Sequence, residues 1–122
     1  MREAFIASTA RTPIGRAFEG AFNNVESPSP MGHAVQRAGV APGEIEDAVI
    51  GRVLAAGTSG SDTGRLAVLA AGLPVEVSAQ PLDRQCSPGW MAIATAAKQV
   101  IVDGMDVTVG GGMGAAGLSE VA

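Results

Sequence analysis

A single cysteine is the strongest candidate for covalent chemistry in this sequence. Cys86 lies in the stretch DRQCSPGW, two residues after Arg84 and immediately before an apolar segment that is predicted to be a long helix. A thiol at a helix N-terminus lies beside the unbonded N–H groups of the first turn and the positive end of the helix dipole, and both favour the thiolate. The same N–H groups can stabilise an oxyanion when a thiolate attacks an acyl carbonyl. The competing interpretation is a plain buried thiol, because free cysteine is among the most buried residue types.

Other residues with possible chemistry are weaker candidates. His33 falls inside the predicted first helix, in MGHAVQR, and is expected to be a helix-surface residue rather than a catalytic one. The acidic residues Glu44, Glu46 and Asp47 adjoin a Pro-Gly pair, which is typical of a solvated turn and not of a metal site. Residues 110–112 are all glycine but lack the spacing of nucleotide-binding loops. We therefore expect no metal and no bound cofactor.

The composition predicts one modest globular domain. The chain has 122 residues, of which 47% are hydrophobic and 16% are charged. Its formal net charge is −4 and its eight Lys and Arg residues are scattered, so nucleic acid is not an expected partner. No apolar run is long enough for a membrane span, and the first residues resemble neither a secretion signal nor a transit peptide. The lone cysteine excludes an internal disulfide, and a reducing, cytoplasmic location is expected.

Strand-like and helical segments alternate along the chain. Short strands are predicted at 4–7, 47–54 and 106–109, and residues 75–81 are expected to be extended or irregular. Helices are predicted at 31–40, from a cap at Ser61 or Asp62 to Gly72, and at 87–103 with Gly104 as C-cap. This alternation is typical of an α/β fold with a mainly parallel sheet.

The predicted helix at 87–103 is apolar on nearly every side. Only Thr95, Lys98 and Gln99 form a narrow polar stripe, a pattern typical of a helix that is buried all round. The other predicted elements are too few and too short to cover such a helix. We therefore expect it to need further chain, another subunit, or both, and we interpret the sequence as a fragment.

The stretch DRQCSPG resembles the nucleophile motif of the thiolases, acyl-CoA acyltransferases in which a cysteine accepts the acyl group. Further segments match in order, and they cover essentially the whole chain: STARTPIGR with GAFNN, RAGVAPGEIEDAVIG, GTSGSDTGR with AGLP, and VGGGM. The resemblance implies that residues 1–122 are the N-terminal part of a thiolase N-terminal domain. It implies an incomplete α/β fold, with a mixed sheet and a buried nucleophile helix, and it makes Cys86 the acyl-accepting nucleophile.

The resemblance also implies an activity, which is acyl transfer between acyl-CoA thioesters and CoA through a cysteine acyl-enzyme. The expected partners are acyl-CoA and CoA as substrates, with a homodimer or homotetramer in the full-length form. Three later motifs of the family do not occur in these 122 residues: Asn-Glu-Ala-Phe, Gly-His-Pro, and a second cysteine in a glycine-rich loop. The isolated chain is therefore expected to be inactive in the full reaction.

The sequence departs from the family pattern at several positions. Pro88 stands where a serine is expected, Trp90 where a smaller apolar residue is expected, and Gly114 where an acidic residue is expected. These departures favour a second hypothesis, a non-catalytic thiolase-fold fragment that acts as a binding or dimerisation module. A third hypothesis, a related condensing enzyme such as a ketoacyl synthase, is disfavoured by TARTPIGR and by the DRQCS context.

Overall fold

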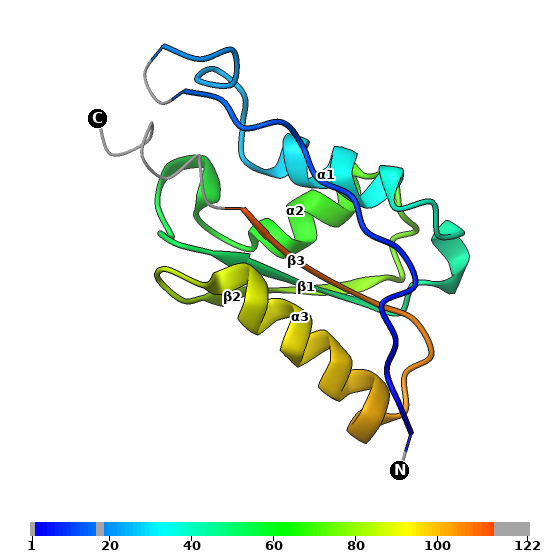
Figure 1. Ribbon diagram of the computed structural model, residues 1–122. Helices are drawn as coiled ribbons and strands as arrows, with labels where there is room; N and C mark the ends of the chain where they lie inside the picture. The colour runs from blue at the N-terminus through cyan, green and yellow to red at the C-terminus, as the bar shows by residue number, and fades with distance from the viewer. Residues whose placement is uncertain (1, 17–18, 114–122) are drawn as a thin grey trace.

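Three parallel strands form the central sheet of this computed structural model, which describes residues 2–16 and 19–113 (Figure 1). The middle strand is β1 (Asp47–Arg52), and it pairs with β2 (Ser78–Asp83) on one side and β3 (Thr108–Met113) on the other. Every residue of β1 is buried, as expected for a parallel strand with helices on both faces. The predicted α/β fold with a parallel sheet is thereby confirmed.

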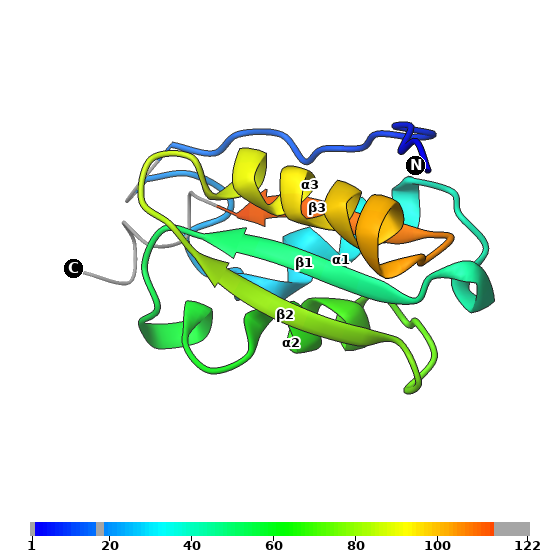
Figure 2. The same ribbon diagram turned by 90° about the horizontal axis from the view of Figure 1, so that it is seen from below.

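Helices cover both faces of the sheet (Figure 2). On one face lie α1 (Pro28–Arg37) and α2 (Thr63–Ala70), and on the other lies α3 (Pro88–Lys98), which continues as a π-helical turn over Gln99–Asp103. Short 3-10 helices occur at Pro42–Glu44 and Gly57–Ser59. Among the helices that the structure describes, none has the length and apolar character needed to cross a membrane.

The sheet divides the hydrophobic core into a larger cluster on one face and a smaller cluster on the other. Successive residues of β1 point to opposite faces, so Ile50 packs under α1 and α2 while Val49 packs under α3. Among the described residues, ten buried side chains form the cluster on the α1 and α2 side, whereas the buried cluster on the α3 side consists of Val49, Ala92 and Ala96. Small side chains there leave α3 close to the sheet.

Helix ends agree well with their sequence signals. The Asp62 carboxylate accepts a hydrogen bond of 2.9 Å from the backbone N–H of Arg65, which confirms the predicted cap of α2. Gly104 ends the π-helical turn with a φ of 81°, as predicted. The first helix begins at Pro28, earlier than the sequence predicts. Proline is tolerated in a first helical turn, because the N–H that it lacks has no intrahelical acceptor there.

Two strands differ from the sequence prediction. Residues 75–81 are predicted to be extended or irregular; residues 78–81 are indeed extended, but they belong to a regular edge strand that contains Pro81, because an edge strand tolerates proline where no N–H is needed. The third strand runs through the triple glycine as far as Met113. Asp47 is buried rather than solvated, and its carboxylate accepts hydrogen bonds from the Ala48 N–H and the Gln99 side-chain amide.

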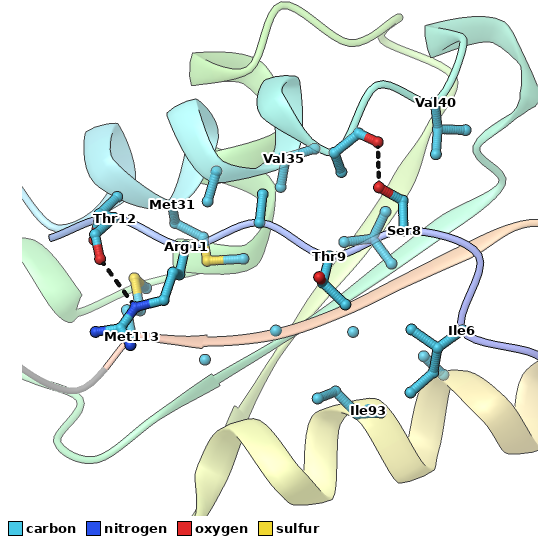
Figure 3. A pocket seen from close by; sticks show the side chains of 18 of the residues that line it. Ile6, Ser8, Thr9, Arg11, Thr12, Met31, Val35, Val40, Ile93 and Met113 are labelled. Carbon is cyan, nitrogen blue, oxygen red and sulfur yellow. Dashed lines mark hydrogen bonds between the residues drawn. The ribbon is translucent and has the colours of Figure 1, made fainter.

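A cavity separates the N-terminal segment from the outer edge of β3. Residues 2–16 run alongside β3 but form no strand, so the strand predicted at 4–7 is wrong. The cavity has a volume of about 1110 Å³ and lies between this segment, α1, α3 and β3, with Ile6, Met31 and Ile93 along its walls (Figure 3). The backbone of residues 4–7 therefore has no ladder partner within reach.

The backbone of α3 lies almost in contact with the backbone of the sheet. A Cβ atom at Gly51 would lie 2.3 Å from the carbonyl oxygen of Pro88, and one at Gly112 would lie 2.6 Å from the Cα of Gly89. Gly110 faces α3 in the same way, one turn further along. Because these neighbours are backbone atoms, they cannot rotate aside. The glycines of β1 and β3 therefore set the height of α3 above the sheet.

The outer side of α3 is apolar and exposed. Trp90 is 79% exposed and Val102, in the π-helical turn, is 76% exposed. This confirms that the described residues cover only one side of a helix whose sequence is apolar nearly all round.

We expect Gly110→Ala to lower the free energy of unfolding by about 1–3 kcal/mol, the usual effect of overpacking a core. The new Cβ would lie 2.6 Å from the Cα of Ile93 and 3.0 Å from the carbonyl oxygen of Ala92. Gly43→Ala is the matched control, since no atom lies within 4 Å of its Cβ, and a change within about 0.5 kcal/mol is expected. Urea unfolding measures the free energy of unfolding of both variants. Equal values for Gly110→Ala and Gly43→Ala would contradict the close contact between Gly110 and α3.

We expect the isolated chain to self-associate through the exposed side of α3. Trp90 is the only tryptophan, so its fluorescence reports on this surface alone. Dilute protein should show red-shifted emission that acrylamide quenches, and emission should move to shorter wavelength as concentration rises. Val102→Ser should weaken association measured by sedimentation, whereas Val75→Ser, at a site that is 68% exposed elsewhere, should not. A monomer at every concentration would refute this expectation.

Candidate active site

Cys86 lies in the turn that joins the end of β2 to the start of α3, at the carboxyl edge of the parallel sheet. The residue is exposed, so the thiol is accessible rather than buried. Its φ is 67°, in the left-handed region that residues other than glycine rarely adopt. Such a conformation persists only where the surrounding structure holds it, and it is frequent at functional sites.

The first turn of α3 supplies unbonded amides close to Cys86 in the chain. The N–H of Met91 makes the first bond of this helix, donating to the carbonyl of Ser87 at 3.3 Å. Pro88 occupies the first helical position and has no N–H, so the amides of Gly89 and Trp90 are the first-turn donors that precede it. Together with the helix dipole, these donors favour negative charge at this end of α3.

Arg84 bridges the two sides of the turn. Its backbone N–H donates to the carbonyl of Arg52 at 3.2 Å, and its side-chain Nε donates to the hydroxyl of Ser87 at 3.3 Å. The Arg84 side chain is therefore held within the turn that contains Cys86.

An ion pair joins the last residues of β1 and β2 directly before this turn. The Nε of Arg52 donates to Oδ1 of Asp83 at 2.6 Å, and Nη2 donates to Oδ2 at 3.1 Å. This hydrogen bonding holds the pKa of the Asp83 carboxyl below its ordinary value and raises the pKa of Arg52. The Arg52 side chain is only 8% exposed, whereas that of Asp83 is 55% exposed.

The remaining nitrogen of Arg52 holds a second loop. Nη1 donates to the carbonyl of Ser59 at 2.7 Å, to the carbonyl of Ser61, and to the hydroxyl of Thr63 at 3.2 Å. Arg52 thus connects the ends of two strands with the loop that leads into α2.

Arg52 and Asp83 are candidate functional residues that the sequence motifs do not mark. A signal was present, because an arginine within the largely apolar strand DAVIGRVL requires a polar partner when it is buried, and Asp83 stands three residues before the cysteine. His33 is exposed on α1, on the face of the sheet opposite α3 (Figure 2). Gly114 lies outside the described residues. Neither His33 nor the large cavity of Figure 3 is part of the Cys86 turn.

Comparisons with known proteins agree on one family. A family model described as the N-terminal domain of thiolase matches residues 4–120. The chain is 38% identical over 112 residues to an acetyl-CoA acetyltransferase of Rhizobium meliloti (strain 1021), covering 88% of this chain and 28% of that protein. It is 36% identical over 117 residues to a 3-ketoacyl-CoA thiolase of Bacillus subtilis (strain 168), covering 92% and 30% respectively.

A solved structure gives the same result. The crystal structure of the Bacillus anthracis acetyl-CoA acetyltransferase superimposes with a TM-score of 0.77 and 38% sequence identity, covering 92% of this chain and 29% of that one. The chain thus spans less than a third of the length of these relatives. Because the family model matches nearly the whole sequence, this chain belongs to the thiolase family and corresponds to its N-terminal portion.

Proposed function

We propose that this chain is the nucleophile-bearing part of a thiolase, in which Cys86 accepts an acyl group from an acyl-CoA thioester. The observation that carries the proposal is the exposed Cys86, held with left-handed backbone at the N-terminus of α3 in a chain of the thiolase family. Relatives named acetyl-CoA acetyltransferase and 3-ketoacyl-CoA thiolase support a CoA thioester as substrate.

The proposed step is a thioester exchange. The Cys86 sulfur attacks the carbonyl carbon of the acyl-CoA, and the C–S bond to CoA then breaks. The thiol proton leaves Cys86 and ends on the departing CoA sulfur, so the products are an acyl-cysteine and free CoA. Negative charge develops on the carbonyl oxygen during the attack, and the first-turn N–H groups of Gly89 and Trp90 are the donors proposed to stabilise it.

Pro88 is compatible with this role. It occupies the first helical position, where the missing N–H removes no bond from the helix. It does remove one donor near the thiolate, so the two amides that follow carry the proposed stabilisation alone.

Completion of a thiolase cycle requires residues beyond those found here. By resemblance to the family, a histidine assists the nucleophile, and a second cysteine moves a proton at the α-carbon of the substrate. We propose that the full-length protein supplies these groups, that it transfers acyl groups to CoA or a second acyl-CoA, and that it assembles as a homodimer or homotetramer in the cytoplasm.

A second candidate function is a non-catalytic binding or dimerisation module. It is favoured by Trp90, a large apolar residue that is 79% exposed four residues after Cys86. A partner that covers the outer side of α3 would bury this indole whether or not Cys86 reacts. Whether Cys86 can be acylated distinguishes the two proposed functions, because only the thiolase function requires it.

We expect the folded chain to form a covalent acyl adduct when it is incubated with acetyl-CoA. Intact-mass measurement should show one acetyl group, and peptide mapping should place it on Cys86, because it is the sole thiol in the sequence. Cys86→Ser is the control and should take up no group that hydroxylamine removes. An unmodified Cys86 in folded protein would refute the nucleophile proposal and favour the binding module.

We also expect the chain alone to show no turnover. Acetoacetyl-CoA consumption in the presence of CoA, followed by ultraviolet absorbance, should equal the background rate, since the later family motifs are absent from the 122 residues. The Cys86→Ser variant measures that background. Catalytic consumption that disappears in the variant would show that the residues described here suffice for the reaction.

A further inference from the structure

The last residues of β1 and β2 form a link that fixes both distance and orientation. Arg52 and Asp83 are register partners in the parallel pair, and two parallel hydrogen bonds of 2.6 and 3.1 Å join the guanidinium to both carboxylate oxygens. A two-pronged contact of this kind restricts the plane of the carboxylate as well as its separation from the cation.

The link ends where the Cys86 turn begins. Arg52 holds Asp83 through its side chain and holds the next residue through its carbonyl, which accepts from the N–H of Arg84 at 3.2 Å. Only Gln85 then precedes Cys86, whose left-handed backbone is a strained conformation for a residue other than glycine. On the far side of the turn, the first turn of α3 rests on Gly51 and Gly112. Arg52 therefore anchors the entry to the turn as the glycines anchor its exit.

Each nitrogen of the Arg52 guanidinium donates at least one hydrogen bond. Nε and Nη2 bind Asp83, and Nη1 binds the loop through Ser59, Ser61 and Thr63. Arg52 is buried but the Asp83 carboxylate is half exposed to water, and an ion pair of this kind contributes little to the stability of a fold. Its value here lies in the geometry that it imposes at the carboxyl edge of the sheet.

We propose that Arg52 and Asp83 are positioning residues for acyl transfer, which hold the Cys86 turn in its left-handed conformation at the N-terminus of α3. The inference rests on the proposed acylation of Cys86. The pair acts through the turn and does not touch the thioester.

The test compares Asp83→Asn with Asp106→Asn in the 122-residue chain. Asp106 also pairs with an arginine, Arg2, but that pair is exposed and lies before β3, at the opposite end of the sheet from Cys86. Acylation of Cys86 by acetyl-CoA and its alkylation by iodoacetamide are timed by mass spectrometry. Urea unfolding curves identify conditions in which every variant is fully folded.

Asp83→Asn should slow acylation by at least about tenfold, because small misplacements of reacting groups have large effects on rate. The rate of alkylation should fall by a smaller factor than the rate of acylation, since only acylation requires a carbonyl oxygen to accept hydrogen bonds from the first-turn N–H groups. Asp106→Asn should stay within about twofold of the parent chain for both reactions. A folded Asp83→Asn that is acylated at the parent rate, or that loses both reactivities by one factor, would overturn the proposal.

Two further results are decisive. If Asp83→Asn does not fold, the double variant Arg52→Met with Asp83→Leu leaves no buried charge unpaired, and the same loss of acylation is expected. Acylation of that variant at the parent rate would overturn the proposal. If the parent chain itself is not acylated, the proposed function fails, and the alkylation rate alone tests the role of the Arg52–Asp83 pair. Slower alkylation of folded Asp83→Asn than of the parent chain supports positioning of Cys86 by the pair. An unchanged alkylation rate overturns that role.

Discussion

No side chain separates the backbone of α3 from the backbone of the sheet at Gly51, Gly110 and Gly112. The buried cluster between them is thin, with Val49, Ala92 and Ala96 as its members, so dispersion contacts there depend on a short separation between helix and sheet. This contact fixes where α3 begins relative to the ends of β1 and β3. A methyl group at any of these positions would lift the helix and carry its N-terminus away from the turn that holds Cys86.

The same edge of the sheet is held by a second, polar contact. The contact between α3 and the sheet is made by backbone atoms. The second contact is made by the buried guanidinium of Arg52, which joins β1 to β2 and to the loop before α2. The two contacts act on opposite ends of one short turn. An exposed cysteine with an unfavourable φ therefore lies between these two contacts. A nucleophile needs such an arrangement, because it must be accessible to substrate and yet fixed in direction.

The sequence predicts the elements that carry strong local signals. Asp62 and Gly104 mark helix ends through capping and a left-handed φ, and the apolar run of β1 marks a buried parallel strand. Elements that depend on distant partners are less predictable. Pro81 conceals β2, which is a strand because β1 lies beside it, and residues 4–7 look like a strand but find no ladder. Cys86 is recognisable from its motif, whereas the Arg52–Asp83 pair depends on strand register, which the sequence does not display.

The outer edge of β3 has no strand paired with it among the residues that the structure describes. Natural edge strands block unwanted pairing with lysine, proline, bulges or cover from another element. The segment TVGGGM has no charged residue and no proline, and the neighbouring N-terminal segment stands off across a cavity. Three consecutive glycines also offer no side chains to obstruct an approaching strand. Released on its own, this polypeptide presents a template for intermolecular β-sheet growth, which would make it a client for chaperones and proteases.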